Sequence, residues 1–151
     1  MKRIIKFLID LFFKSKKSFL LPKKNNLIIL DSLGSKKIAD HILGHSDFRI
    51  MHNLRYQINI PIAFWSLLLV PKYKKYSYYV CYIKYVGAKN AITWIDNHYD
   101  YCKILSFISN CKLFLIQNGR DDSNRFKDIQ KGKYKCDYYF INGKCTENYF
   151  S

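Results

Sequence analysis

The alternation of apolar runs and polar clusters predicts a β-α-β unit near the middle of the chain. Residues 91–95 form a continuous apolar run, and residues 113–116 form a second one. Between them, apolar side chains recur at helix spacing from Tyr101 through Ile104 and Leu105 to Ile108. Two uniformly apolar runs joined by a helix predict neighbouring parallel strands that are buried on both faces.

The same pattern predicts further strands and helices on either side of this unit. Apolar runs at residues 27–30, 48–51 and 138–141 indicate three more strands. Helices are expected after Ser35, over residues 62–70 between Pro61 and Pro71, and over residues 72–85. The order predicts an α/β fold: an open, Rossmann-like parallel sheet of about five strands, flanked by helices.

The N-terminal residues have a different pattern. Residues 1–17 divide into one apolar and one basic face on a helical wheel, which predicts an amphipathic helix within an N-terminal segment, residues 1–21. The helix is too short and too charged to span a bilayer, but it suits a membrane interface. The alternative is a helix that packs on its own domain. Residues 22–26 indicate a linker to the α/β domain, residues 26–151.

The charge narrows the choice of partners. The 151 residues carry a formal charge of +15, with 26 Lys and Arg against 11 Asp and Glu, which favours nucleic acid, a membrane surface or phosphorylated substrates. Compositional drift that leaves most lysines as solvated surface is the competing interpretation. Residues 72–85 interleave Lys and Tyr, as single-stranded nucleic-acid platforms do, but their helical periodicity favours a half-buried helix. Five widely spaced cysteines without a C-x-x-C pair indicate reduced thiols, with no disulfide framework or zinc site.

Polar clusters follow the two central strands, and ligands of open parallel sheets bind beyond the carboxyl ends of the strands. The first cluster is Asp96-Asn97-His98, in which Asp96 suits a general base or a helix N-cap, and His98 titrates near neutrality or is structural. The second cluster is Gln117-Asn118-Gly119-Arg120. The turn at Asn118-Gly119 lets backbone amides approach a ligand, and the Arg120 guanidinium suits phosphate or carboxylate. The alternative is a turn followed by a surface cation. Motifs of P-loop NTPases, α/β-hydrolases and zinc proteases are absent from the sequence.

Three motifs follow one another in the chain and together resemble those of a known protein family. They are "IDN" after one predicted strand, "IQNGRxD" after the next and "DYxFxxGK" on the strand that follows. Over about residues 26–150, and specifically from residue 92 onward, the chain resembles the N-terminal half of bacterial surface-carbohydrate (capsule and lipopolysaccharide) biosynthesis transferases. These are GT-B-like, two-domain proteins related in organisation to teichoic-acid polymerases of the CDP-glycerol glycerophosphotransferase type.

The resemblance implies one half of a GT-B architecture, the acceptor-side domain, with a catalytic Asp96. It further implies that Asn97, His98, Gln117, Asn118, Gly119 and Arg120 bind substrate. The expected partners are a nucleotide-activated sugar or alditol donor, held mainly by a second domain that this sequence lacks, and a polysaccharide or lipid-linked acceptor. The expectation is therefore a truncated or split transferase, cytoplasmic or peripheral on the inner membrane face. Neither a metal or cofactor nor nucleic acid is expected. The alternatives are a noncatalytic membrane- or partner-docking module and a basic nucleic-acid-binding domain.

Overall fold

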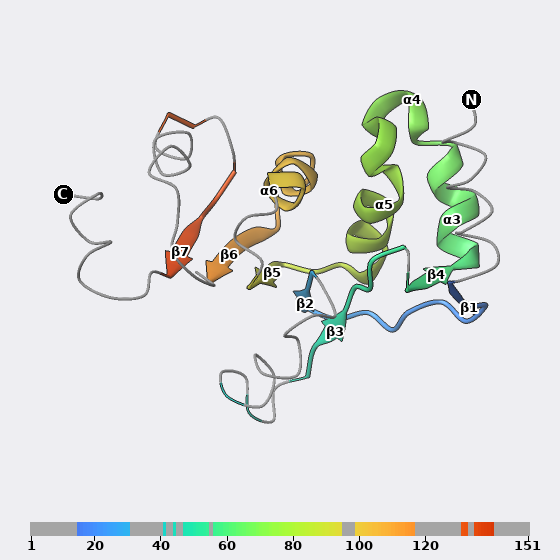
Figure 1. Cartoon of the computed structure of the whole chain (residues 1–151), viewed down its shortest axis with the longest axis horizontal. Coiled ribbons are helices and arrows are strands. Elements are labelled where there is room, and N and C mark those ends of the chain that lie inside the picture. The colour runs from blue at the N-terminus through green and yellow to red at the C-terminus, as the bar shows by residue number, and fades with distance from the viewer. Residues whose placement is uncertain are drawn as a thin grey trace.

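The chain is built around a parallel β-sheet (Figure 1). The computed structural model describes residues 15–30, 41, 44, 47–54, 56–94, 99–116, 131–132 and 135–140. In these residues a five-stranded sheet has the spatial order β3-β2-β5-β6-β7, and every neighbouring pair is parallel. The five strands are β3 (Arg49–Ile50), β2 (Leu27–Ile29), β5 (Asn90–Thr93), β6 (Lys112–Ile116) and β7 (Tyr138–Phe140).

One face of this sheet is closed by two helices, α5 (Ser77–Val86) and α6 (Tyr99–Ser106), which lie on the same side of the sheet in Figure 1. Alternate strand residues point toward these helices, since successive side chains of a strand face opposite ways. Ile28 and Leu113 are fully buried there against Ile83 and Leu105. Each such side chain contributes about 1.5–3 kcal/mol through its burial.

The opposite face begins buried and becomes exposed toward β7. Ile29 and Ile92 are buried on this face, among partly buried neighbours that include Phe114. The Phe114 ring stacks on the Tyr138 ring, with centroids 4.7 Å apart. Tyr138 and Phe140 remain 46% and 54% exposed, so this face ends in a solvent-accessible row of aromatic rings.

A second, two-stranded sheet lies beside the first. Strand β1 (Lys16–Ser18) pairs in parallel with β4 (Gln57–Asn59). Helix α3 (Ile60–Leu67) starts directly after β4, because the side chain of Asn59 caps its first turn. The chain then continues through the short helix α4 (Val70–Tyr73) and a 3-10 turn, η2 (Lys74–Tyr76), into α5.

The structure confirms most of the predicted elements. The runs at 27–30, 91–95 and 113–116 hold three adjacent parallel strands, and the runs at 48–51 and 138–141 hold the two outer strands. The helical patterns around residues 101–108 and 72–85 correspond to α6 and α5. The helix expected after Ser35 and residues 141–151 lie outside the described residues.

Two predictions about element boundaries are wrong. Pro71 does not end the helix that begins at Pro61: α3 ends at Leu67, and Pro71 lies in the first turn of α4. Proline suits a first helical turn, because the N–H group that it lacks has no partner there. The predicted N-terminal helix does not reach Lys17, because Lys16–Ser18 form β1, where the Lys16 N–H donates to the Tyr56 carbonyl oxygen at 2.9 Å. Residues 1–14 lie outside the described residues.

Candidate functional site

The structure locates the strands that precede the predicted site residues. Asp96, Asn97, His98, Gln117, Asn118, Gly119 and Arg120 themselves lie outside the described residues. The strands before them, β5 and β6, pair in parallel from Asn90 with Lys112 to Thr93 with Leu115. The two predicted segments therefore start from neighbouring strand ends at the same edge of the sheet.

The third motif includes a residue whose role is structural. Asp137 precedes β7, and its carboxylate accepts a hydrogen bond from the Leu113 N–H at 2.7 Å. The Asp137 N–H in turn donates to the Leu113 carbonyl oxygen at 3.1 Å. Next to it, the Lys135 ammonium donates to the carbonyl oxygens of Ile108 and Cys111. These bonds fix β7 to the start of β6, so the acidic residue of this motif holds the sheet together.

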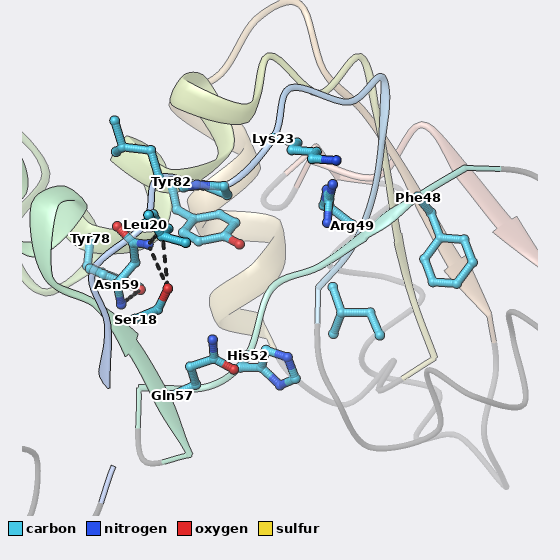
Figure 2. Close-up of a pocket in the computed structure, with 13 residues that line it drawn as sticks. Ser18, Leu20, Lys23, Phe48, Arg49, His52, Gln57, Asn59, Tyr78 and Tyr82 are labelled. Carbon is cyan, nitrogen blue, oxygen red and sulfur yellow. Dashed lines mark hydrogen bonds between the residues drawn. The ribbon is translucent and has the colours of Figure 1, made fainter. Parts of the chain in front are cut away.

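A cavity of about 450 Å³ opens beside β3, at the margin of the large sheet (Figure 2). Four parts of the chain form it: residues 18–23 after β1, residues 48–52 around β3, the strand β4, and the side chains of Tyr78 and Tyr82 on α5. We call this cavity the β3 pocket. It lies between the two sheets, so both sheets are needed to form it.

Positive charge dominates the lining of the β3 pocket. Lys23 and Arg49 line it together with His52, and none of its described lining residues is Asp or Glu. The Nε atom of Arg49 is buried and has no hydrogen-bond partner. Among the described residues, no other buried side-chain nitrogen or oxygen lacks one. A buried donor without a partner costs about 1–3 kcal/mol, and more when it is charged. The pocket thus concentrates cationic donors that the surrounding protein leaves unused.

A network of hydrogen bonds around Asn59 fixes the wall of the pocket opposite these cations. The Asn59 side chain donates to the Leu20 carbonyl oxygen at 2.7 Å and accepts from the Ile62 N–H at 3.2 Å. Its backbone N–H donates to the Tyr78 hydroxyl oxygen at 2.9 Å. Ser18 donates to the same Leu20 oxygen at 3.2 Å. One residue therefore ties β4, α3, α5 and the segment after β1 to one another.

Two tyrosine hydroxyl groups of α5 face this region, and both keep their protons at neutral pH. Burial raises the pKa of Tyr78 far above its ordinary value. Burial also raises the pKa of Tyr82, against an opposing effect of the Arg49 guanidinium. Figure 2 shows the Tyr82 hydroxyl directed toward the part of the pocket where Arg49 lies. This hydroxyl is available as a hydrogen-bond donor beside the guanidinium.

His52 adds a neutral group. Burial, with a smaller contribution from the Lys16 charge, lowers the pKa of His52 below its ordinary value of 6.5. The imidazole is therefore uncharged at pH 7 and carries one donor and one acceptor nitrogen. At neutral pH the charge of the pocket comes from Lys23 and Arg49.

The arrangement of the β3 pocket suits the binding of an anion better than it suits catalysis of a reaction of that anion. The described lining offers no carboxylate as general base, and the thiols elsewhere are poor nucleophiles: burial raises the pKa of Cys111 to about 11 and that of Cys136 to about 12. These two and the other described cysteines, Cys81 and Cys102, form no disulfide. In the described ranges no three His, Cys, Asp or Glu side chains cluster closely enough to hold a metal ion.

A second cavity, of about 520 Å³, lies at the other end of the strands. Asn90 and Lys112, the first residues of β5 and β6, line it together with Lys84 and Lys89. Open parallel sheets bind ligands beyond the opposite, carboxyl ends of their strands. The β3 pocket, in which the Nε atom of Arg49 lacks a hydrogen-bond partner, is the stronger candidate.

Sequence analysis did not identify the β3 pocket, because its residues come from four segments between residues 18 and 82. One signal was present: Arg49 interrupts the otherwise apolar run Phe48-Arg49-Ile50-Met51. A charged residue within an apolar run needs a partner or a function if the run becomes buried. The i, i+4 spacing of Tyr78 and Tyr82 also places both hydroxyl groups on one side of α5.

Comparisons with protein-family models, with curated proteins and with solved structures find no match to this chain. Its function therefore has to be inferred from the placement and the chemistry of its own residues.

Proposed function

We propose that this chain is the acceptor-side domain of a transferase in bacterial surface-carbohydrate biosynthesis, with a Rossmann-like sheet that forms one half of a GT-B-like architecture. The observation that carries the proposal is the order of the motif-bearing strands. The segments with "IDN" and "IQNGR" follow β5 and β6, the "DYYF" segment includes β7, and these three strands are consecutive neighbours. Three motifs on three adjacent parallel strands can contribute to one site at the edge of the sheet.

The order of the strands in the sheet also supports a site at the edge formed by their carboxyl ends. The chain passes from β2 outward to β3, then returns to the other side of β2 to form β5, β6 and β7 in turn. The order of the strands therefore reverses between β2 and β5. In open α/β sheets, ligands bind at such a reversal, outside the carboxyl ends of the strands. Asp96 follows one of the two strands that flank it.

In the proposed reaction, Asp96 accepts the proton of the acceptor hydroxyl as that hydroxyl attacks the activated donor. Asn118, Gly119 and Arg120 supply amide and guanidinium donors for an anionic acceptor or for the leaving diphosphate, and Asn97, His98 and Gln117 bind the remaining polar groups of the substrate. The donor is a nucleotide-activated sugar or alditol held by a second domain, and the acceptor is a polysaccharide or a lipid-linked saccharide. The reaction needs no further cofactor.

The test is a transfer assay with the full chain and a donor-binding domain supplied in cis or in trans. General-base catalysis contributes about 10²–10⁴ in rate, so Asp96→Asn should reduce transfer by that order. Stability should change little, because Asn caps helices about as well as Asp. Asp47→Asn, at an exposed carboxylate, is the matched control and should transfer at the parent rate. If the Asp96→Asn variant transferred at the parent rate, Asp96 would not be a general base, and its role would be limited to capping the helix.

A second candidate function is docking to an anionic membrane surface, and an exposed apolar patch favours it. Five large apolar side chains of α3, α4 and the turn between them are 45–81% exposed: Phe64, Trp65, Leu67, Leu68 and Val70. Exposed Lys72, Lys74 and Lys75 follow directly. Within the described residues, no helix combines the length and the apolar character needed to cross a bilayer. An apolar tip with a basic rim suits shallow insertion among anionic headgroups.

Vesicle co-sedimentation tests this second function. The full chain should bind vesicles with anionic lipid and lose binding when Leu67 and Leu68 are both changed to Ser. Phe140→Ser, which removes a 54% exposed apolar side chain from β7, is the control. Equal binding by the double variant and the parent would exclude this patch as the contact with the membrane.

A further inference from the structure

We propose that the β3 pocket binds a phosphorylated sugar and that Arg49 and Lys23 hold its phosphoryl group. The proposal does not depend on the transferase function, because it rests on the lining of this pocket and not on residues 96–98 or 117–120. It adds a ligand site at the margin of the sheet, beside β3. The first predicted strand end, at β5, is two strands away, which is about 10 Å at the usual spacing of strands.

The charges of the pocket favour an anion. Lys23 and Arg49 face the same cavity without a carboxylate among its described lining residues, so their mutual repulsion is uncompensated. Arg49 cannot lose its proton at any physiological pH, and its Nε donor is buried without a partner. A bound anion offsets both charges and can accept hydrogen bonds from the terminal N–H groups of the guanidinium.

Phosphate fits these donors better than carboxylate does. A guanidinium presents parallel N–H donors that match two oxygens of one phosphoryl group, while an ammonium neutralises the remaining charge as a point cation. The Tyr82 hydroxyl, directed toward Arg49 in Figure 2, is a third donor for the third oxygen. A phosphomonoester has three acceptor oxygens and close to two negative charges, whereas a carboxylate has two oxygens and one charge.

The rest of the pocket sets the size and character of the ligand. About 450 Å³ is within the range of small-molecule sites, and it leaves room for one ring beyond the phosphoryl group. The Gln57 amide and the neutral imidazole of His52 line it as partners for hydroxyl groups. Asn59 and Ser18 are already bonded to Leu20 and so act as a fixed wall. Apolar residues, Leu20 and Pro22 among them, complete the walls against which a sugar ring packs.

Isothermal titration of the full chain with glucose 1-phosphate tests the proposal, with glucose, glucuronate and inorganic phosphate as the other probes. Glucose 1-phosphate should bind most tightly, glucuronate and inorganic phosphate more weakly, and glucose not measurably. Arg49→Gln should raise the Kd for glucose 1-phosphate about 10- to 100-fold, which is the loss expected for hydrogen bonds to a charged group. Lys103→Gln, at an exposed lysine of α6, should leave the Kd unchanged.

A second readout separates binding from folding. Arg49→Gln should keep or raise the Tm of the ligand-free chain, since the Nε that it removes has no partner, and should lose the rise in Tm caused by glucose 1-phosphate. If Arg49→Gln does not fold, Lys23→Gln replaces it as the test. This substitution removes an exposed cation from the rim of the pocket and should raise the Kd for glucose 1-phosphate severalfold. Glucose bound as tightly as glucose 1-phosphate would overturn the proposal. An equal loss of affinity in Lys103→Gln would also overturn it, because it would show general electrostatic attraction only.

Discussion

The large sheet and the region around β1 and β4 are stabilised in different ways. Between the large sheet and its two helices, contact is almost entirely apolar, with Ile28, Ile83, Leu105 and Leu113 removed from solvent. The β1–β4 region, which we define as the two strands with residues 19–23, 52–54 and 56 beside them, depends on the polar network of Asn59. Beside this region, in the edge strand β3 of the large sheet, the Nε atom of Arg49 is buried without a hydrogen-bond partner.

The difference separates stability from binding. The apolar sheet supplies most of the folding free energy, because apolar burial is the dominant favourable contribution to folding. That surplus allows the margin of the sheet to keep unpaired donors and a cavity, each of which destabilises the ligand-free chain. If this division is correct, substitutions in the apolar core should mainly reduce stability. Substitutions of residues that line the β3 pocket should mainly reduce ligand affinity.

The largest loss of stability is expected in the large sheet. Leu113 of β6 is fully buried in the apolar core, and Leu113→Ala should reduce the free energy of unfolding by about 2–5 kcal/mol. Leu68→Ala, at a side chain that is 81% exposed, should change it by no more than about 0.5 kcal/mol. Urea denaturation of both variants measures the difference. Similar losses would show that the apolar layer under α5 and α6 is not the core.

A smaller loss is expected in the polar network. Tyr78→Phe removes the acceptor of the Asn59 N–H and should cost about 1–3 kcal/mol, since that donor stays buried. Tyr82→Phe, four residues along α5, removes a hydroxyl that faces the β3 pocket and should change the free energy of unfolding by no more than about 0.5 kcal/mol. Its affinity for glucose 1-phosphate should nevertheless fall. If Tyr82→Phe destabilised the chain as much as Tyr78→Phe, both hydroxyl groups would be structural.

The smallest effect is a dependence of stability on pH through His52. Burial and Lys16 lower the pKa of His52 in the folded chain below 6.5, its value in the unfolded chain. The unfolded state therefore binds the proton more readily, so the stabilising contribution of neutral His52 is present above pH 6.5 and is lost as the pH falls through the folded pKa. Urea denaturation at pH 7.5 and 5.5 should show a larger loss in the parent than in His52→Gln. The other three histidines are common to both proteins, so an equal loss would show that His52 does not contribute.

The sequence predicted the large sheet because each of its inner strands is buried on both faces and therefore reads as an uninterrupted apolar run. Residues 27–30, 91–95 and 113–116 needed no tertiary information to be recognised, and their parallel pairing followed from the helices between them. The exact ends of the helices were harder to predict. Pro71 looked like the end of one helix, although it begins the next, because proline is compatible with both positions.

The β1–β4 region was missed because its structure depends on contacts between distant residues. Lys16–Ser18 has no apolar alternation, and it becomes a strand only because β4, about 40 residues later, offers backbone partners. The β3 pocket depends on the same contacts, since its cations and hydroxyl groups come from segments that only the folded chain brings together. Arg49, a charge inside an apolar run, was the one residue from which a site could have been suspected.

The central claim is that a phosphorylated sugar binds beside β3, at the margin of the sheet, and not in the apolar core under α5 and α6. Heteronuclear NMR of the ¹⁵N-labelled full chain, titrated with glucose 1-phosphate, tests it most directly. The account predicts saturable shifts of the amide signals of Arg49, His52, Gln57 and Tyr82, with little change at Leu105 and Leu113. Shifts that are absent from these four residues, or that are spread over exposed lysines such as Lys103 without saturation, would contradict it.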